Sequence, residues 1–185
     1  MKNALILHGT ESSSKENWFP WLKTQLEGQG YQVLVPNLPR ADKPNPRRYT
    51  DFLLHSGFAF NSESIIVGHS SGSVEILHLL PHLQVRIHAS YLVGAFKDND
   101  FLKWEPNSEL FDEPFNFKGI RSHCEKFIFL HSEDDPFCPL THASYLATKI
   151  GGELTIIPHQ KHFSVSTMGE QYRTFPALLE RIIAT

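Results

Sequence analysis

Short apolar segments that alternate with longer amphipathic stretches constrain the fold of this chain more than any other feature of its sequence. Six such segments, rich in branched side chains, cover residues 4–7, 33–35, 65–67, 90–93, 127–130 and 154–157. They show no clear polar alternation, which is typical of strands covered on both faces in a parallel sheet. Strands that alternate with helices predict a parallel sheet with right-handed crossovers, and hence an α/β layered domain rather than a helix bundle or a β-sandwich.

Apolar residues at helical spacing predict three of the intervening helices. The first covers residues 18–26 and ends near Gly28 or Gly30, the second covers residues 74–80, and the last covers residues 175–183. The sequence contains no internal repeat, so the pattern describes one layered unit.

Length and composition narrow the class of protein. A chain of 185 residues predicts one domain over residues 1–185. Its net charge of −3 gives no positive field for a nucleic acid, and its two cysteines are too few for a disulfide framework. The apolar run at residues 4–7 is too short for a signal peptide or a membrane span. We therefore expect a soluble, cytoplasmic protein with neither a nucleic-acid nor a membrane partner.

Two regions interrupt the regular pattern. Residues 37–48 are rich in proline and predict a surface loop before a helix near residues 49–55. Residues 95–121 form an aromatic-rich insertion, and loops of that length are usually functional. Its aromatic residues either line a pocket or cap, or simply pin the loop to the body. On the first interpretation, Phe96 and Trp104 are candidate substrate-binding residues.

The most informative motif is the segment Gly68-His69-Ser70-Ser71-Gly72, which follows a predicted strand and precedes a predicted helix. In that context the pattern G-x-S-x-G indicates a nucleophile elbow. The glycines allow the chain to pass a sharp, strained corner, and the corner serine presents its hydroxyl above the sheet. Ser70 is therefore the candidate nucleophile. The alternative is a Gly/Ser-rich turn in which Ser71 caps the helix.

A serine nucleophile needs a base and an acid later in the chain, each after a late strand. The acid turn contains Asp134 and Asp135, and we favour Asp135 because the residue before a proline adopts extended geometry. The base loop contains His159 and His162, and we favour His162, which precedes an aromatic residue. The order Ser70, Asp135, His162 is that of α/β-hydrolases.

Two backbone N–H groups are candidate oxyanion donors. Ser71 follows the nucleophile at a helix N-terminus, and Thr10 follows the first strand and a glycine. His69, which flanks the nucleophile, and Phe137, in the acid turn, are further candidates for contact with substrate.

These motifs together resemble the α/β-hydrolase superfamily, and more closely the small serine hydrolase family that includes the retinoblastoma-binding protein 9. The resemblance extends over nearly the whole chain and is most specific in GHSSG and DDPF. It implies a three-layer α/β/α sandwich, a minimal hydrolase fold with about six parallel strands in the order 2-1-3-4-5-6. It also implies Ser70, Asp135 and His162 as a triad acting on esters or aminoacyl esters.

The chain departs from that family in two places. The stretch after the first strand, residues 10–14, lacks the typical glycines, and the L-x-C-x-E motif is absent, so no retinoblastoma-type partner is expected. His78 and His82 lie four residues apart, but no third ligand completes a zinc site, so no metal or other cofactor is predicted. Cys124 and Cys138 are interpreted as buried structural residues.

The sequence thus predicts a serine hydrolase that acts through an acyl-enzyme, most readily a carboxylesterase for small or medium acyl or aminoacyl esters. Thioesterase and peptidase activity remain open, because the same triad performs all three reactions. The alternative is a catalytically weak hydrolase-fold protein whose aromatic insertion binds a protein or small-molecule partner. The oligomeric state is left open.

Overall fold

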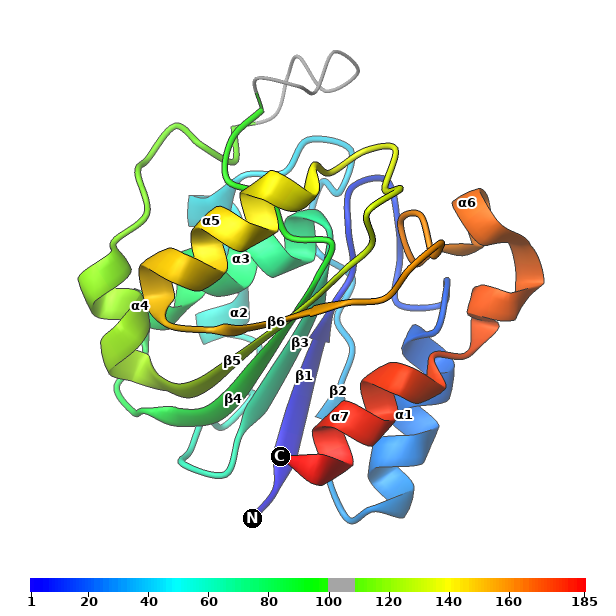
Figure 1. Cartoon of the computed structure of the whole chain (residues 1–185). Coiled ribbons are helices and arrows are strands. Elements are labelled where there is room, and N and C mark those ends of the chain that lie inside the picture. Colours follow the sequence, from blue (N-terminus) through cyan, green and yellow to red (C-terminus); the bar gives the residue numbers. More distant parts are fainter. Residues whose placement is uncertain (100–108) are drawn as a thin grey trace.

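Six parallel strands form a single sheet at the centre of the molecule (Figure 1). The computed structural model describes residues 1–99 and 109–185. The strands are β1 (Asn3–Leu7), β2 (Gln32–Leu34), β3 (Ile65–His69), β4 (Ile87–Val93), β5 (Cys124–His131) and β6 (Glu153–Ile156). Their order across the sheet is β2-β1-β3-β4-β5-β6, and every neighbouring pair is parallel. The predicted fold class and strand order are therefore confirmed.

Helices cover both faces of the sheet. The helices are α1 (Phe19–Gly28), α2 (Pro46–Leu54), α3 (Ser71–Leu79), α4 (Phe117–His123), α5 (Leu140–Ile150), α6 (Val165–Met168) and α7 (Pro176–Ala184). Helices α1 and α7 pack on one face, and α2, α3, α4 and α5 pack on the other. None of the helices in the described ranges has the length and apolar character needed to cross a bilayer.

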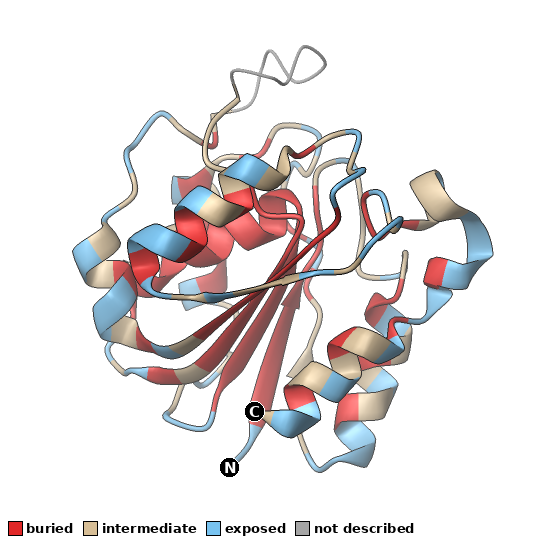
Figure 2. Cartoon of the chain, in the orientation of Figure 1, coloured by how far each residue is buried: buried red, intermediate tan, exposed pale blue. Residues whose placement is uncertain are grey.

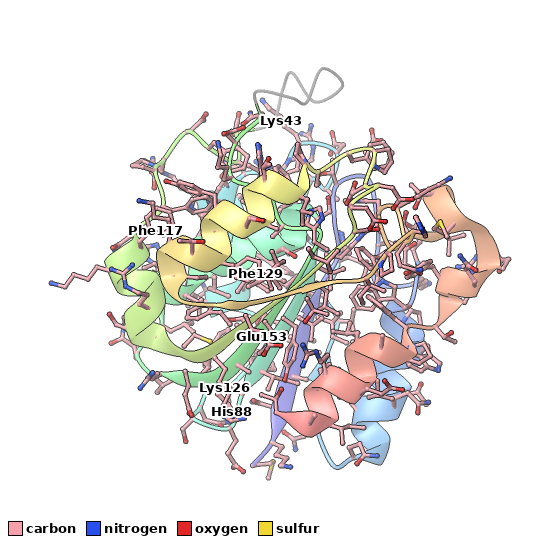
Figure 3. The ribbon with its side chains drawn as sticks, viewed as in Figure 1. Lys43, His88, Phe117, Lys126, Phe129 and Glu153 are labelled. Atoms are coloured by element: carbon pink, nitrogen blue, oxygen red, sulfur yellow. The ribbon has the colours of Figure 1, made fainter. Side chains whose placement is uncertain are left out.

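Each face of the sheet has its own hydrophobic core, because successive side chains of a strand point to opposite faces. In β1, Leu5 and Leu7 pack with α2 and α3, whereas Ala4 and Ile6 pack with α1 and α7. Phe129 of β5 lies at the centre of Figure 3 and is fully buried. Strands β1 and β3 are buried along their whole length (Figure 2).

The two edge strands differ from the expectation that every strand is covered on both faces. Residues of β2 and β6 are partly or fully exposed. An edge strand has a neighbour on one side only, so fewer helices reach over it. The apolar segments at residues 33–35 and 154–157 therefore line the margins of the core.

Helix α2 begins earlier than the proline content of its sequence suggested. The predicted start was near residue 49, but the helix begins at Pro46, and Asn45 is its N-cap. The Asn45 side chain accepts a hydrogen bond from the Arg48 amide at 2.8 Å. A proline inside a helix removes a backbone hydrogen bond, but in the first turn the backbone N–H groups have no acceptor within the helix, so proline is favoured there.

In the described part of the aromatic-rich segment, residues 95–99 and 109–121, a helix begins that the sequence did not predict. Helix α4 starts at its last aromatic residue, Phe117, and Asn116 caps it by accepting a bond from the Gly119 amide. Among the predicted site residues, Trp104 lies outside the described ranges. The cysteines Cys124 and Cys138 are both buried, as interpreted from the sequence.

Candidate active site

The junction between β3 and α3 holds Ser70 in a strained backbone conformation. Ser70 has φ 56° and ψ −124°, a region that non-glycine residues rarely adopt. A Cβ atom on Gly68 would lie 2.6 Å from the carbonyl oxygen of Gly72. One on Gly72 would lie 2.6 Å from the carbonyl oxygen of His8. Both positions therefore exclude any side chain, which is the physical requirement of a nucleophile elbow.

Hydrogen bonds tie this elbow to the next strand. The Ser70 amide donates to the carbonyl of Val93, at the end of β4, at 2.8 Å. The Ser73 hydroxyl bonds the carbonyls of Gly68 at 2.7 Å and Val93 at 2.9 Å. Ser70 is 8% exposed and lines a cavity of about 610 Å³ at the carboxyl ends of the strands. The elbow is thus a rigid corner beside an open cavity.

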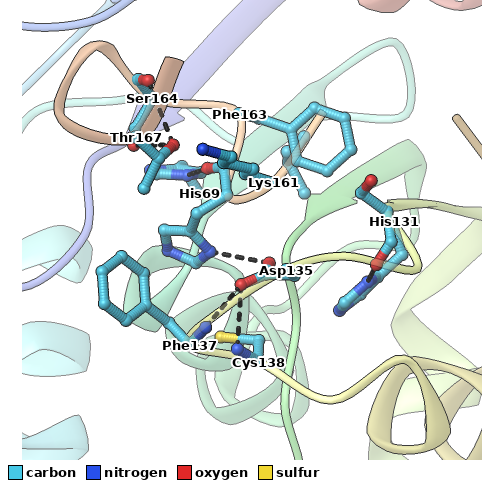
Figure 4. Close-up of polar contacts among 12 residues, drawn as sticks. His69, His131, Asp135, Phe137, Cys138, Lys161, Phe163, Ser164 and Thr167 are labelled. Atoms are coloured by element: carbon cyan, nitrogen blue, oxygen red, sulfur yellow. Dashed lines mark hydrogen bonds and ion pairs between the residues drawn. The ribbon is translucent and has the colours of Figure 1, made fainter. Parts of the chain in front are cut away.

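Asp135 and His162 lie in contact beside the same cavity. Nδ1 of His162 donates to Oδ2 of Asp135 at 2.8 Å, and the Asp135 side chain is fully buried. The other carboxylate oxygen, Oδ1, accepts the amides of Phe137 at 2.8 Å and Cys138 at 2.9 Å (Figure 4). A Cβ on Gly94 would lie 3.2 Å from Cε1 of the His162 ring. These contacts orient the imidazole and leave its Nε2 free of Asp135.

The two alternative residues lie elsewhere. The His159 side chain is 85% exposed and pairs with Glu133, with 3.2 Å between Nδ1 and Oε1. Oδ1 of Asp134 accepts the Ser132 hydroxyl at 2.7 Å and the Lys161 amide at 2.9 Å. These hydrogen bonds hold the pKa of Asp134 below its usual range. Neither His159 nor Asp134 lines the cavity.

The candidate oxyanion residues are neighbours of the elbow. Thr10 lines the cavity, and its hydroxyl donates to the Ser71 hydroxyl at 3.0 Å. A Cβ on Gly9 would lie only 3.0 Å from Cβ of Ser70. The loop after β1 therefore passes close to Ser70, and Thr10 joins this loop to Ser71.

His8 fixes the start of that loop, a role the sequence analysis did not assign. Its Nδ1 bonds the Gly9 carbonyl at 2.8 Å, and its Nε2 accepts the Leu38 amide at 2.9 Å. The ring is fully buried, and desolvation lowers its pKa. A neutral ring with its proton on Nδ1 satisfies both bonds. The sequence feature that could have indicated this role is the position of His8 between the first strand and Gly9.

Two of the predicted substrate-contact residues line the cavity and one does not. His69 and Phe137 line it, and the Phe137 ring meets the His162 ring edge-on, with 5.2 Å between centroids. Phe96 is 2% exposed and packs against Phe111, with 5.5 Å between ring centroids. Phe96 belongs to a small apolar cluster against which Phe137 also packs, but Phe96 itself does not line the cavity.

Several polar residues also line the cavity, and no motif in the sequence indicated them. They come from the loop before α1 and from the region of α6, and they are Glu11, Ser12, Glu16, Asn17, Ser164, Ser166 and Arg173. Arg173 pairs with Glu170 at 3.1 Å, and the Ser12 hydroxyl bonds Glu16 at 2.8 Å. The cavity therefore combines an apolar ring at Phe137 with a wall that carries charges of both signs.

Potential metal ligands come together at one place among the described residues. Ligand atoms of Asp135, Cys138 and His162 lie within 4.8 Å of one another. The carboxylate and the imidazole are already joined by a hydrogen bond, and Cys138 is buried. This group differs from the pair His78 and His82 weighed from the sequence. His78 instead packs against Phe115, with 4.9 Å between ring centroids.

The parallel sheet and the strained serine at the end of its third strand define an α/β hydrolase. Comparison with known proteins gives the family: residues 4–181 match the serine hydrolase family, and the chain belongs to it. The resemblance inferred from the sequence motifs is thereby confirmed.

Several relatives extend over nearly the whole chain. YdeN of Bacillus subtilis (strain 168) is 31% identical over 166 residues, covering 88% of this chain and 86% of its own. The crystal structure of the ydeN gene product has a TM-score of 0.88 and covers all of this chain and 98% of its own. The serine hydrolase RBBP9 of Rattus norvegicus is 25% identical over 173 residues, which cover 93% of this chain and 91% of its own.

Esterases share the fold at greater distance. The structure of Est1E from Butyrivibrio proteoclasticus with ferulic acid bound has a TM-score of 0.69 at 12% identity. It covers 99% of this chain and 90% of its own. At that identity the likeness shows the fold alone.

Proposed function

We propose that this protein is a carboxylic ester hydrolase that acts through an acyl-enzyme on Ser70. The observation that carries the proposal is the hydrogen bond between His162 and the buried Asp135, beside the cavity that Ser70 and His162 both line. A buried carboxylate bonded to Nδ1 fixes the tautomer whose Nε2 can accept a proton. The three groups therefore take the roles of nucleophile, base and orienting acid.

The reaction proceeds in two steps. His162 removes the Ser70 proton as Oγ attacks the ester carbonyl, and the resulting oxyanion is held by the amides of Ser71 and Thr10. The imidazolium then protonates the alcohol as the bond between the carbonyl carbon and the alcohol oxygen breaks. In the second step His162 deprotonates water, which attacks the acyl-enzyme. The acid is released and the proton returns to Ser70.

The cavity suggests the class of ester. A volume of about 610 Å³ suits a small or medium acyl group, and Phe137 offers an apolar surface next to His162. Ferulic acid bound to the structurally similar Est1E supports an ester of a small organic acid. The polar wall at Glu16 and Arg173 leaves room for an aminoacyl ester. Thioesters and amides pass through the same intermediates and belong in the substrate panel.

The alternative of a binding protein finds no specific support in the described part of the aromatic segment. Phe96, Phe111 and Phe115 pack into the body of the molecule rather than forming an exposed face. We therefore retain one proposed function.

Loss of the nucleophile tests the proposal. Ser70→Ala should abolish hydrolysis of p-nitrophenyl esters and leave the melting temperature nearly unchanged, because it removes one hydroxyl at the cavity wall. Ser166→Ala, which also removes a hydroxyl from the cavity lining, is the matched control and should retain activity. Undiminished turnover in Ser70→Ala protein would refute the assignment.

A further inference from the structure

The loop that carries His162 has an unusual backbone. His159, Lys161 and Phe163 have φ of 58°, 47° and 51°, so three non-glycine residues among five are left-handed. Such conformations persist only where surrounding contacts impose them. The position of the His162 imidazole therefore depends on what holds this loop, residues 159–163.

The acid turn holds the amide side of the loop. The His159 amide donates to the Glu133 carboxylate at 3.2 Å, and the Gln160 amide donates to the Ser132 hydroxyl at 3.0 Å. The Lys161 amide donates to the Asp134 carboxylate at 2.9 Å. Glu133 and Asp134 thus bond the base loop, whereas Asp135 bonds the imidazole.

Two ring N–H groups hold the carbonyl side. Nε1 of Trp18, at the N-cap of α1, donates to the Phe163 carbonyl at 3.0 Å. Nε2 of His69, the residue before the nucleophile, bonds the carbonyl of His162 at 2.8 Å. A carbonyl only accepts, so the His69 proton is on Nε2. Consecutive carbonyls are therefore held by donors from two elements far apart in sequence.

Both donors are shielded from water. Trp18 is fully buried and His69 is 4% exposed. The Phe175 ring packs against both Phe163 and Trp18. It is stacked on Phe163, with 5.3 Å between ring centroids, and edge-on to Trp18, with 5.6 Å between ring centroids. Desolvation, with the neighbouring His162 as a smaller cause, lowers the pKa of His69 to about 3. The His69 ring is therefore neutral at pH 7 and adds no charge beside the base.

We propose that Trp18 and His69 are positioning residues, whose ring N–H groups fix the loop of residues 159–163 and so hold the His162 imidazole between Asp135 and Ser70. This inference rests on the proposed function. Neither side chain reacts. Each donates a hydrogen bond to a buried backbone carbonyl of the loop. Without that bond the strained loop would relax, and the imidazole would move.

Three substitutions separate the hydrogen bonds from ring packing. Trp18→Phe and His69→Phe keep an aromatic ring and remove the N–H. His69→Gln restores a donor near the position of Nε2. Trp21→Phe makes the same change as Trp18→Phe on the same helix, at a half-buried residue outside the loop contacts, and is the matched control.

We expect Trp18→Phe and His69→Phe each to lower kcat about 3- to 10-fold, the range for one hydrogen bond, with KM changed less than about twofold. His69→Gln should recover most of kcat. Trp21→Phe should match the unaltered protein.

NMR provides a readout that needs no turnover. The proton on Nδ1 of His162, bonded to Asp135, should exchange faster with water in Trp18→Phe and His69→Phe than in Trp21→Phe protein. The inference is overturned if Trp18→Phe and His69→Phe match Trp21→Phe in proton exchange and in kcat, or if His69→Gln is as impaired as His69→Phe. Failure of the proposed function appears separately, as turnover that survives Ser70→Ala.

Discussion

Two histidines three residues apart in the loop after β6 occupy opposite environments. His162 has an 8% exposed side chain bonded to Asp135, whereas His159 is 85% exposed and pairs with Glu133. His162→Ala should lower kcat by about 10⁴-fold or more, because a triad loses its function when the base is removed. The kcat of His159→Ala protein should stay within about threefold of that of the unaltered protein, as expected for the loss of an exposed ion pair.

Ester hydrolysis by the two purified variants, with the melting temperature as a check on folding, decides between them. If His159→Ala were the inactive variant and His162→Ala the active one, the base would have to be reassigned.

Residue types and their order along the chain indicated the candidate reacting groups, but not the residues that hold those groups in position. Ser70, Asp135 and His162 stand out because each follows a strand and has a motif around it. Trp18 carries no such signal, because its hydrogen bond joins segments that only folding brings together. His8 stands between a strand and a glycine, but its bond to the Leu38 amide likewise forms only on folding. The polar wall near Arg173 was missed for the same reason. Phe96 was proposed from composition alone, which does not distinguish a pocket residue from a buried one.

At the scale of elements, the junction of β3 and α3 tolerates no side chain at Gly72. Gly72→Ala would place a Cβ 2.6 Å from two backbone carbonyl oxygens, those of Leu7 and His8. We expect a loss of about 1–3 kcal/mol in the free energy of unfolding, or more if β1 and α3 separate. Urea denaturation measures the change.

Gly28→Ala is the control for that variant. Gly28 ends α1, and a Cβ there would meet no atom within 4 Å, so alanine should stabilise by about 0.5–1 kcal/mol. Equal stability of the Gly72→Ala and Gly28→Ala proteins would contradict the close packing of the elbow.

A buried carboxyl group joins α2 to α3. Glu75 is fully buried, its Oε1 accepts the Thr50 hydroxyl at 2.8 Å, and burial raises its pKa well above the usual range. The folded protein keeps a proton that the unfolded chain releases above about pH 4.5. Folding of the unaltered protein is therefore penalised increasingly as pH rises to the folded pKa, and Glu75→Gln removes that penalty.

We expect the stability of Glu75→Gln protein relative to the unaltered protein to improve between pH 5 and pH 8, by up to about 1.4 kcal/mol per pH unit. Urea unfolding of both proteins at the two pH values measures this difference. A difference that does not change with pH would show that Glu75 is ionised in the folded state.

Apolar periodicity predicted the elements better than their boundaries. The strands and helices α1, α3 and α7 follow from it, whereas α2 starts at Pro46 because the Asn45 cap outweighs the usual effect of proline. Helix α4 was missed because its seven residues are too few for a periodic pattern, and one residue, Ile120, is buried.

At the scale of the whole molecule, the buried histidines make the free energy of unfolding depend on pH. Desolvation lowers the pKa of four histidines, to about 3 for His69, to about 4 for His78, and downward for His8 and His131. Below pH 6.5 the unfolded chain gains protons that the folded protein does not, so stability is full above that pH and is lost as pH falls.

We expect each histidine that stays neutral to contribute a loss of about 2 kcal/mol in the free energy of unfolding between pH 7 and pH 5. Glu75 acts in the opposite direction, so the measurement is best made by urea denaturation of Glu75→Gln protein. Stability that stays constant over this range would contradict the neutral state of the buried rings.

The alternation of apolar and amphipathic segments predicted a parallel sheet between helices, and no more of its topology. The order β2-β1-β3-β4-β5-β6 was implied by the resemblance of the motifs to α/β-hydrolases, and it is confirmed. Cavity volume and lining followed only from the packed structure, since loops from five parts of the chain contribute to them.

Covalent labelling of the folded protein with a fluorophosphonate tests the central claim most directly, because the reagent reacts with a serine that has been activated. The account predicts one adduct by intact mass, mapped to Ser70, absent from Ser70→Ala and strongly reduced in His162→Ala protein. Folded protein that stays unlabelled, or an adduct that persists in Ser70→Ala, would contradict it.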